Sequence, residues 1–236
     1  MNNFDYTDGI TTFEGHWALN GDTKSIRPCV LVGHAWSGPS EHFNLVAKAL
    51  SKNGFIGFAI DVYGKGVRGK VDGDNSHLMN PLMEDRALLR KRLLAAFKVA
   101  QEHPLVISDK IAILGHCFGG LCALDLARAN PPGLKGAVSI HGLLTGANLD
   151  TKPRIDASVL VLHGWEDPMT KPSGVLEFTQ EMTVAKADWQ LHAYGHAMHA
   201  FSFVGADIPE LGIRYNEKAH RRSEKSALDF LNEIFS

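Results

Sequence analysis

The pentapeptide GHCFG at residues 115–119 constrains the fold of this chain more than any other segment, because it joins a strand to a helix through a very tight turn. The apolar run 111–114 precedes it, and 121–127 reads as a helix. Glycines two residues either side of Cys117 suit a strained turn, since side chains there would collide with the neighbouring strand and helix. A helix that starts just after Cys117 directs N–H groups at the sulfur, which favours the thiolate.

A turn of this form is a nucleophile elbow, with cysteine where serine is usual. The pentapeptide alone leaves a second interpretation open, in which a glycine-rich turn holds a buried structural cysteine. The other two cysteines are most simply core residues, because Cys122 lies about one turn into the helix and Cys29 begins a buried strand. The rest of the chain decides between these interpretations.

Apolar or alternating runs recur along the chain, and most of them precede a helical pattern. The predicted strands cover 11–19, 29–33, 55–60, 110–114, 137–141, 158–163 and 188–194. The predicted helices cover 42–52, Pro81 to about 102, 118–129, 173–185 and 216–235, and 62–80 is predicted to be a long loop. This alternation indicates an α/β protein with a mostly parallel central sheet and helices on both faces. We expect a single domain over 1–236.

The composition is that of an ordinary globular protein, with 236 residues, 44% hydrophobic and 21% charged. A net charge of −2 gives no basic field for nucleic acid or an anionic membrane. No signal peptide is evident, and no apolar stretch approaches the roughly 18–20 residues that span a bilayer. Three cysteines are too few for a disulfide framework, so we expect a cytoplasmic protein. The 12 histidines form neither HxH nor HExxH, and we expect no metal and no cofactor.

Sites in such sheets gather beyond the carboxyl ends of the strands, and candidate partners for Cys117 occur there. A cysteine nucleophile needs a base, and the base needs an anion that fixes its tautomer. Asp167 follows one strand, and both His196 and His199 follow the last. Cys117, Asp167 and His199 lie 50 and 32 residues apart, in the chain order of the α/β-hydrolase fold. Glu166 is the rival acid and His196 the rival base.

With these residues in this order, the chain resembles the dienelactone hydrolases, which are cysteine-dependent members of the α/β-hydrolase fold. The likeness lies in GHCFGG at 115–120, AIDVYG at 59–64, HGWEDP at 163–168 and HAF at 199–201. It extends from about Cys29 to the C-terminal helix, which is nearly the whole chain.

The resemblance implies that Cys117 is the nucleophile, His199 the base and Asp167 its acidic partner. His199 is favoured because a small residue and a phenylalanine follow it, and Asp167 because it directly precedes a proline. The backbone N–H groups of Phe118 and Trp36 are expected to form the oxyanion hole. The substrate would be a small ester, lactone or thioester, cleaved through a covalent acyl-enzyme.

The chain departs from the family pattern at two positions. Ala35 stands where the family usually has a glutamate that takes part in activating the thiol, so His199 should activate Cys117 here. Phe203 stands where an arginine often binds an anionic substrate, and Arg68 is another candidate cation, in the long loop. The alternative function is therefore a redox-responsive or ligand-binding thiol protein that keeps the fold without turnover. Acyl transfer to an acceptor other than water shares the same chemistry.

Overall fold

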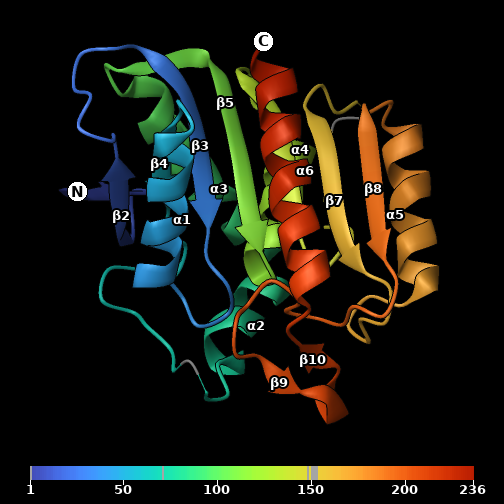
Figure 1. Cartoon of the computed structure of the whole chain (residues 1–236). Helices are drawn as coiled ribbons and strands as arrows, with labels where there is room; N and C mark the ends of the chain where they lie inside the picture. Colours follow the sequence, from blue (N-terminus) through green and yellow to red (C-terminus); the bar gives the residue numbers. More distant parts are fainter. Residues whose placement is uncertain (1, 71, 148, 150–153) are drawn as a thin grey trace.

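Eight strands form one sheet in the order β1-β2-β4-β3-β5-β6-β7-β8 in the computed structural model, which describes residues 2–70, 72–147, 149 and 154–236 (Figure 1). The strands are β1 (Asn2–Thr7), β2 (Thr12–Ala18), β3 (Arg27–Gly33), β4 (Ile56–Ala59), β5 (Val106–His116), β6 (Leu134–Ile140), β7 (Ser158–Gly164) and β8 (Trp189–Tyr194). From β4 to β8 all neighbours are parallel, whereas β1 and β2 pair antiparallel at one edge. The predicted mostly parallel sheet is confirmed.

Helices cover both faces of the sheet. They are α1 (Glu41–Lys52), α2 (Ser76–Glu84), α3 (Arg86–Glu102), α4 (Phe118–Ala129), α5 (Pro172–Val184) and α6 (Glu217–Phe235). Helices α1 and α6 pack on one face, where Val30 and Val32 of β3 point, and α3, α4 and α5 pack on the other, where Leu31 points (Figure 1). This alternation places apolar side chains on both faces of one strand, as a doubly covered parallel sheet requires.

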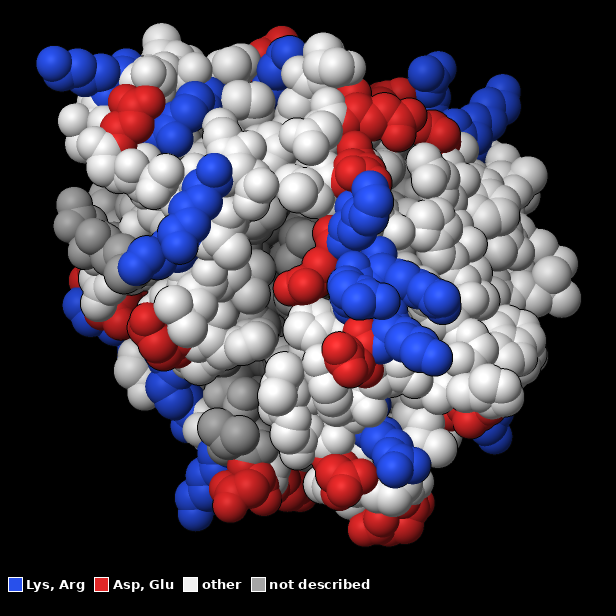
Figure 2. All heavy atoms as spheres, in the orientation of Figure 1, with Lys and Arg blue, Asp and Glu red and all other residues white. Residues whose placement is uncertain are grey.

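Acidic and basic side chains are interspersed over the outer surface of the face that α1 and α6 cover (Figure 2). A column of basic side chains along α6 is flanked by acidic ones (Figure 2). Mixed signs fit the small net charge of −2 and produce no extended field of one sign on this face. In the part of the chain that the structure describes, no helix is both long enough and apolar enough to cross a membrane.

The segment between β4 and β5 differs from its prediction. Residues 62–80 were expected to form a loop and Pro81 to open a long helix, but two helices occupy this region, and Pro81 lies inside the first. Asp85 ends α2 and caps α3, accepting a hydrogen bond from the Leu88 N–H at 2.8 Å. A carboxylate cap satisfies a free N–H group at a helix start, which proline cannot do. The helix start predicted at Pro81 is therefore wrong.

The strand β1 was not among the predicted elements, because its sequence NNFDYT is mostly polar and shows no buried run. Its pairing with β2, from Asn2 opposite Trp17 to Thr7 opposite Thr12, supplies the hydrogen bonds that its own side chains do not suggest. The short hairpin of β9 (Asp207–Ile208) and β10 (Ile213–Arg214) was also missed. Both β1 and this hairpin are too short or too polar for periodicity to reveal.

Candidate active site

Cys117 lies on the turn between β5 and α4 with φ of 55° and ψ of −118°, a conformation that side chains other than glycine rarely adopt. A Cβ atom on Gly115 would collide with the carbonyl oxygen of Gly119, and one on Gly119 would collide with that of Gly33. Both glycines of the pentapeptide are thus required by close backbone approach. The geometry is that of the predicted elbow, and it leaves the Cys117 side chain partly exposed.

The loops after β7 and β8 bring two side chains to this sulfur. His199 Nε2 lies 3.2 Å from Cys117 Sγ, and His199 Nδ1 lies 2.8 Å from Asp167 Oδ2. Asp167 also accepts a hydrogen bond from the Met169 N–H at 2.8 Å, which fixes its carboxylate. The side chains of His199 and Asp167 are only 4% and 1% exposed. A buried carboxylate thus holds an imidazole that reaches the sulfur.

The pKa values of the sulfur and the imidazole are shifted in opposite directions. Burial raises the pKa of the Cys117 thiol, but the charge and hydrogen bond of His199, together with the Phe118 and Trp36 N–H groups, more than offset this, so the thiol pKa is lowered. Burial lowers the pKa of His199, yet Cys117 and Asp167 raise it to about 10. The two shifts together favour a thiolate beside an imidazolium.

Two backbone N–H groups also bind the sulfur. Those of Phe118 and Trp36 hydrogen-bond Cys117, and both lower the pKa of its thiol. Phe118 is the first residue of α4, and Trp36 lies in the loop after β3. Two convergent N–H groups beside a nucleophile can stabilise negative charge there, on the sulfur or on an oxygen bonded to the attacked carbon.

The rival acid and the rival base pair with each other. His196 Nδ1 lies 2.9 Å from Glu166 Oε1, and the His196 side chain is 94% exposed. Neither residue has a hydrogen bond or an ion pair with Cys117. Cys29 and Cys122 are buried, and burial raises the pKa of both thiols. The structure therefore separates the rivals from the sulfur.

Four histidines at strand ends are buried and neutral. Burial lowers the pKa of His34 to about 4 and that of His116 to about 3, and it also lowers the pKa values of His141 and His163. Within 2–70, 72–147, 149 and 154–236, no three His, Cys, Asp or Glu side chains are grouped to hold a metal ion. Hydrogen bonds hold the rings of His34 and His141, whereas both ring nitrogens of His163 have no hydrogen-bond partner among the described residues.

His141 is a neighbour of the base that the sequence patterns did not indicate. Its ring centroid lies 5.2 Å from that of His199, in an edge-on arrangement, and its Nε2 lies 2.8 Å from Ser202 Oγ. His141 directly follows β6, and Ser202 follows His199 closely in the chain. Both residues follow strands whose carboxyl ends lie at the same edge of the sheet, β6 for His141 and β8 for Ser202, and this shared edge is the signal that could have indicated the contact.

The structure defines the surroundings of Arg68, Phe203 and Ala35. Arg68 donates to the Val67 carbonyl at 2.8 Å and lies 3.6 Å from Glu14 and 3.8 Å from Asp61. Phe203 packs edge-on against His141, with ring centroids 5.2 Å apart. Ala35 is buried. Arg68 is thus already paired with carboxylates, and Phe203 packs against another aromatic ring.

Comparison with known proteins identifies the family of this chain. The model of the dienelactone hydrolase family matches residues 17–235. An uncharacterized protein of Caenorhabditis elegans is 36% identical over 152 residues, covering 63% of this chain and 95% of the relative. A "probable 2-oxo-3-(5-oxofuran-2-ylidene)propanoate lactonase" of Bradyrhizobium sp is 30% identical over 184 residues, covering 74% of this chain and 73% of the relative.

Solved structures of similar fold also include dienelactone hydrolases. A dienelactone hydrolase-like promiscuous phosphotriesterase from metagenomic libraries has a TM-score of 0.93 at 32% identity, covering 100% of this chain and 98% of that chain. A dienelactone hydrolase from Anabaena variabilis has a TM-score of 0.70 at 20% identity, covering 100% of this chain and 98% of that chain, which shows a shared fold. This chain therefore belongs to the dienelactone hydrolase family, a family of ester and lactone hydrolases with the α/β-hydrolase fold.

Proposed function

We propose that this chain hydrolyses a neutral ester, lactone or thioester through a Cys117–His199–Asp167 triad and a covalent acyl-enzyme. Membership of the dienelactone hydrolase family makes the chain an ester or lactone hydrolase. The observation that carries the triad assignment is the pair of His199 contacts, at 3.2 Å to the Cys117 sulfur and 2.8 Å to Asp167. A base held between an anion and a nucleophile is the arrangement that acyl transfer requires.

In the first half of the proposed reaction, Cys117 Sγ attacks the substrate carbonyl carbon and a C–S bond forms. The carbonyl oxygen becomes an oxyanion, which the N–H groups of Trp36 and Phe118 would stabilise. When the tetrahedral intermediate collapses, the bond to the leaving oxygen or sulfur breaks. His199 Nε2–H gives its proton to the leaving group, and a thioester with Cys117 remains.

In the second half, His199 takes a proton from water, and the oxygen of that water attacks the thioester carbon. A second tetrahedral intermediate collapses, the C–S bond breaks and a carboxylic acid leaves. The thiolate and the imidazolium of His199 are then restored. Asp167 keeps its hydrogen bond to Nδ1 throughout, which holds the tautomer and stabilises the positive form of the ring.

The neutral substrate class is supported by the side chains around the loops of the site. Arg68, the cation that the sequence offers for a carboxylate, is paired with Glu14 and near Asp61. Arg86 is paired with the buried Asp125. Phe203 supplies an aromatic ring where an arginine often stands in the family, and the Trp36 side chain is half-buried in the loop after β3. Apolar and aromatic surfaces favour an uncharged acyl group.

A substrate panel tests this function. Wild type and Cys117→Ala are assayed side by side on neutral lactones, aryl esters, thioesters and a carboxylated lactone. A neutral aryl phosphotriester is added because one structural relative is named for that activity. We expect steady turnover of neutral acyl substrates after a burst, and loss of both with Cys117→Ala. Stoichiometric labelling without steady turnover would support the thiol-protein alternative, and turnover by Cys117→Ala would overturn the triad.

A further inference from the structure

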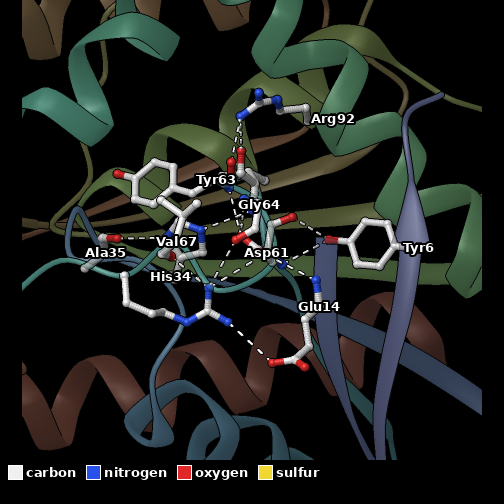
Figure 3. Close-up of polar contacts among 11 residues, drawn as sticks. Tyr6, Glu14, His34, Ala35, Asp61, Tyr63, Gly64, Val67 and Arg92 are labelled. Carbon is white, nitrogen blue, oxygen red and sulfur yellow. Dashed lines mark hydrogen bonds and ion pairs between the residues drawn. The ribbon is translucent and has the colours of Figure 1, made fainter. Parts of the chain in front are cut away.

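His34, which the proposed mechanism does not use, has both ring nitrogens hydrogen-bonded in the loop beside the site (Figure 3). Its Nε2 lies 3.2 Å from the Val62 backbone nitrogen, and its Nδ1 lies 2.8 Å from the Ala35 carbonyl oxygen. A backbone N–H only donates and a carbonyl only accepts, so Nε2 must be the acceptor and the hydrogen must be on Nδ1. Burial lowers the pKa of His34 to about 4, which keeps this neutral tautomer at neutral pH.

The Ala35 carbonyl and the Trp36 N–H belong to the same peptide plane. A peptide is planar and rigid, so a hydrogen bond that fixes the direction of the carbonyl also fixes the direction of the N–H at its other end. That N–H is one of the two that bind the Cys117 sulfur. The Ala35 carbonyl also accepts from the Gly38 N–H at 3.0 Å, and a carbonyl that accepts two hydrogen bonds makes its own N–H a stronger donor.

Tyr63 holds the next peptide along the chain. Its hydroxyl donates to the Trp36 carbonyl oxygen at 2.9 Å. The Tyr63 N–H in turn donates to Asp61 Oδ1 at 2.8 Å, and the Tyr6 hydroxyl hydrogen-bonds the Asp61 backbone (Figure 3). The loop after β4 is thus fixed by a buried carboxylate and by β1, and it anchors the peptides on both sides of Trp36.

We infer that His34 and Tyr63 are positioning residues of the oxyanion hole, which aim the Trp36 N–H at the charge that develops beside Cys117. His34 acts on the peptide that carries this N–H, and Tyr63 acts on the peptide that follows it. The inference rests on the proposed function, since it gives the Trp36 N–H a role in stabilising the tetrahedral oxyanion. It requires that the effect of both side chains is larger on acyl transfer than on other reactions of the sulfur.

The main test compares His34→Leu with His34→Asn. The leucine variant removes both hydrogen bonds of the ring, whereas the asparagine amide keeps an N–H donor close to the place of Nδ1. Since loss of an oxyanion donor lowers kcat by about 100- to 1,000-fold, misdirection of one should lower it by about 10- to 100-fold in His34→Leu. KM should stay within about threefold of wild type, because the interaction forms mainly in the transition state. His34→Asn should restore most of kcat.

A second readout separates positioning from general damage. Alkylation of Cys117 by iodoacetamide passes through no oxyanion, so its maximal rate at high pH should be unchanged in His34→Leu. The midpoint of its pH profile should move upward, because the sulfur loses part of a hydrogen bond. The matched control is His103→Leu, which removes a ring nitrogen that accepts from the Leu105 N–H at 3.2 Å, before the start of β5. This control should keep wild-type kcat and pH profile.

Three results would overturn the inference: wild-type kcat in folded His34→Leu, an equal fall in kcat and in the maximal alkylation rate, or a matching loss in His103→Leu. Should His34→Leu not fold, Tyr63→Phe carries the test, since it loses only a hydroxyl. Its kcat should fall about 3- to 10-fold with maximal alkylation unchanged, and an unchanged kcat would refute the role. If Cys117→Ala keeps turnover, the proposed function fails. If Cys117→Ala is inactive while His34→Leu is normal, only this inference fails.

Discussion

His199 Nε2 lies 3.2 Å from Cys117 Sγ, within reach of a shared proton, and the same ring is hydrogen-bonded to Asp167 on its other side. The contact explains why the thiol pKa falls while the imidazole pKa rises to about 10, since each charged form stabilises the other. A resting thiolate is therefore expected without any carboxylate in the loop after β3.

Iodoacetamide should label Cys117 well ahead of Cys29 and Cys122. The reactive form is the thiolate, and burial raises the pKa values of the other two thiols. Peptide mass spectrometry after partial labelling measures the order of modification, alongside residual hydrolase activity. Modification of Cys29 or Cys122 first, with full activity retained, would contradict the assignment of the nucleophile.

The buried pair His199–Asp167 and the exposed pair His196–Glu166 allow matched variants to be compared. His199→Ala and Asp167→Asn should lower kcat by about 10³- to 10⁴-fold, as loss of a triad member does in related chemistry. His196→Ala and Glu166→Gln change the same residue types in the exposed pair, 2.9 Å apart, and should keep kcat within about twofold of wild type. Steady-state kinetics on one neutral aryl ester measures all four. A large loss in His196→Ala would transfer the role of base to that residue.

The pH profile of alkylation should reflect both shifted groups. Since the thiol pKa is lowered, the rate should persist below the ~8.5 midpoint of a free cysteine and fall only as pH drops through the lowered pKa. The imidazolium should persist until pH rises through about 10, so the ion pair is present between these two limits. His199→Ala should move the midpoint upward, toward that of a free thiol. A wild-type midpoint at ~8.5 would contradict the ion pair.

Much of this site could be predicted from sequence because it depends on local patterns. The GHCFG pentapeptide, the order of Cys117, Asp167 and His199, and the strand-helix alternation each appear in the residue types themselves. The pairing of Glu166 with His196 could not be predicted, because it depends on how two loops meet at the surface. The separate helix α2 and the start of α3 were missed because Pro81 is a weaker start signal than the Asp85 cap.

The role inferred for His34 could not be predicted from the sequence either. It depends on the direction of one peptide plane and on which ring nitrogen carries the hydrogen, and neither leaves a pattern in the residue types. The same is true of Tyr63, which the sequence places only in a polar loop. Backbone geometry of this kind follows from long-range packing, here from Asp61 and β1, so it emerges only when the fold is known.

A buried cluster of charged side chains ties α4 to α3 and should contribute to the stability of the fold. Asp125 is bound by the Arg86 Nε at 2.6 Å and by Arg128 Nη1 at 3.1 Å, and all three side chains are buried. Asp125→Ala leaves the buried Arg86 guanidinium without a carboxylate, whereas Arg128 keeps Glu181 at 2.7 Å, and the loss should lower the free energy of unfolding by about 3–5 kcal/mol.

The control for this variant is Asp229→Ala, which removes the exposed partner of Lys225 on α6. A surface pair of this spacing is worth about 0.3–0.5 kcal/mol, so the control should unfold at nearly the wild-type denaturant concentration. Urea titration followed by circular dichroism measures both variants. Equal destabilisation by the two substitutions would contradict the proposed importance of the buried pair.

Substitution of Ala35 tests whether the absence of a glutamate at this position controls the pKa of the Cys117 thiol. Ala35 is buried in the loop that also supplies the Trp36 N–H, so a carboxylate there would place a second negative charge close to the thiolate. Ala35→Glu should raise the thiol pKa by about one unit and slow alkylation at neutral pH by up to about tenfold. Ala35→Gln has nearly the same size without the charge and should alkylate close to the wild-type rate. The two variants are compared by iodoacetamide kinetics across pH, with thermal unfolding as the check on folding. Equal thiol pKa values in Ala35→Glu and Ala35→Gln would show that charge in this loop does not control the nucleophile, because the two side chains differ in little else.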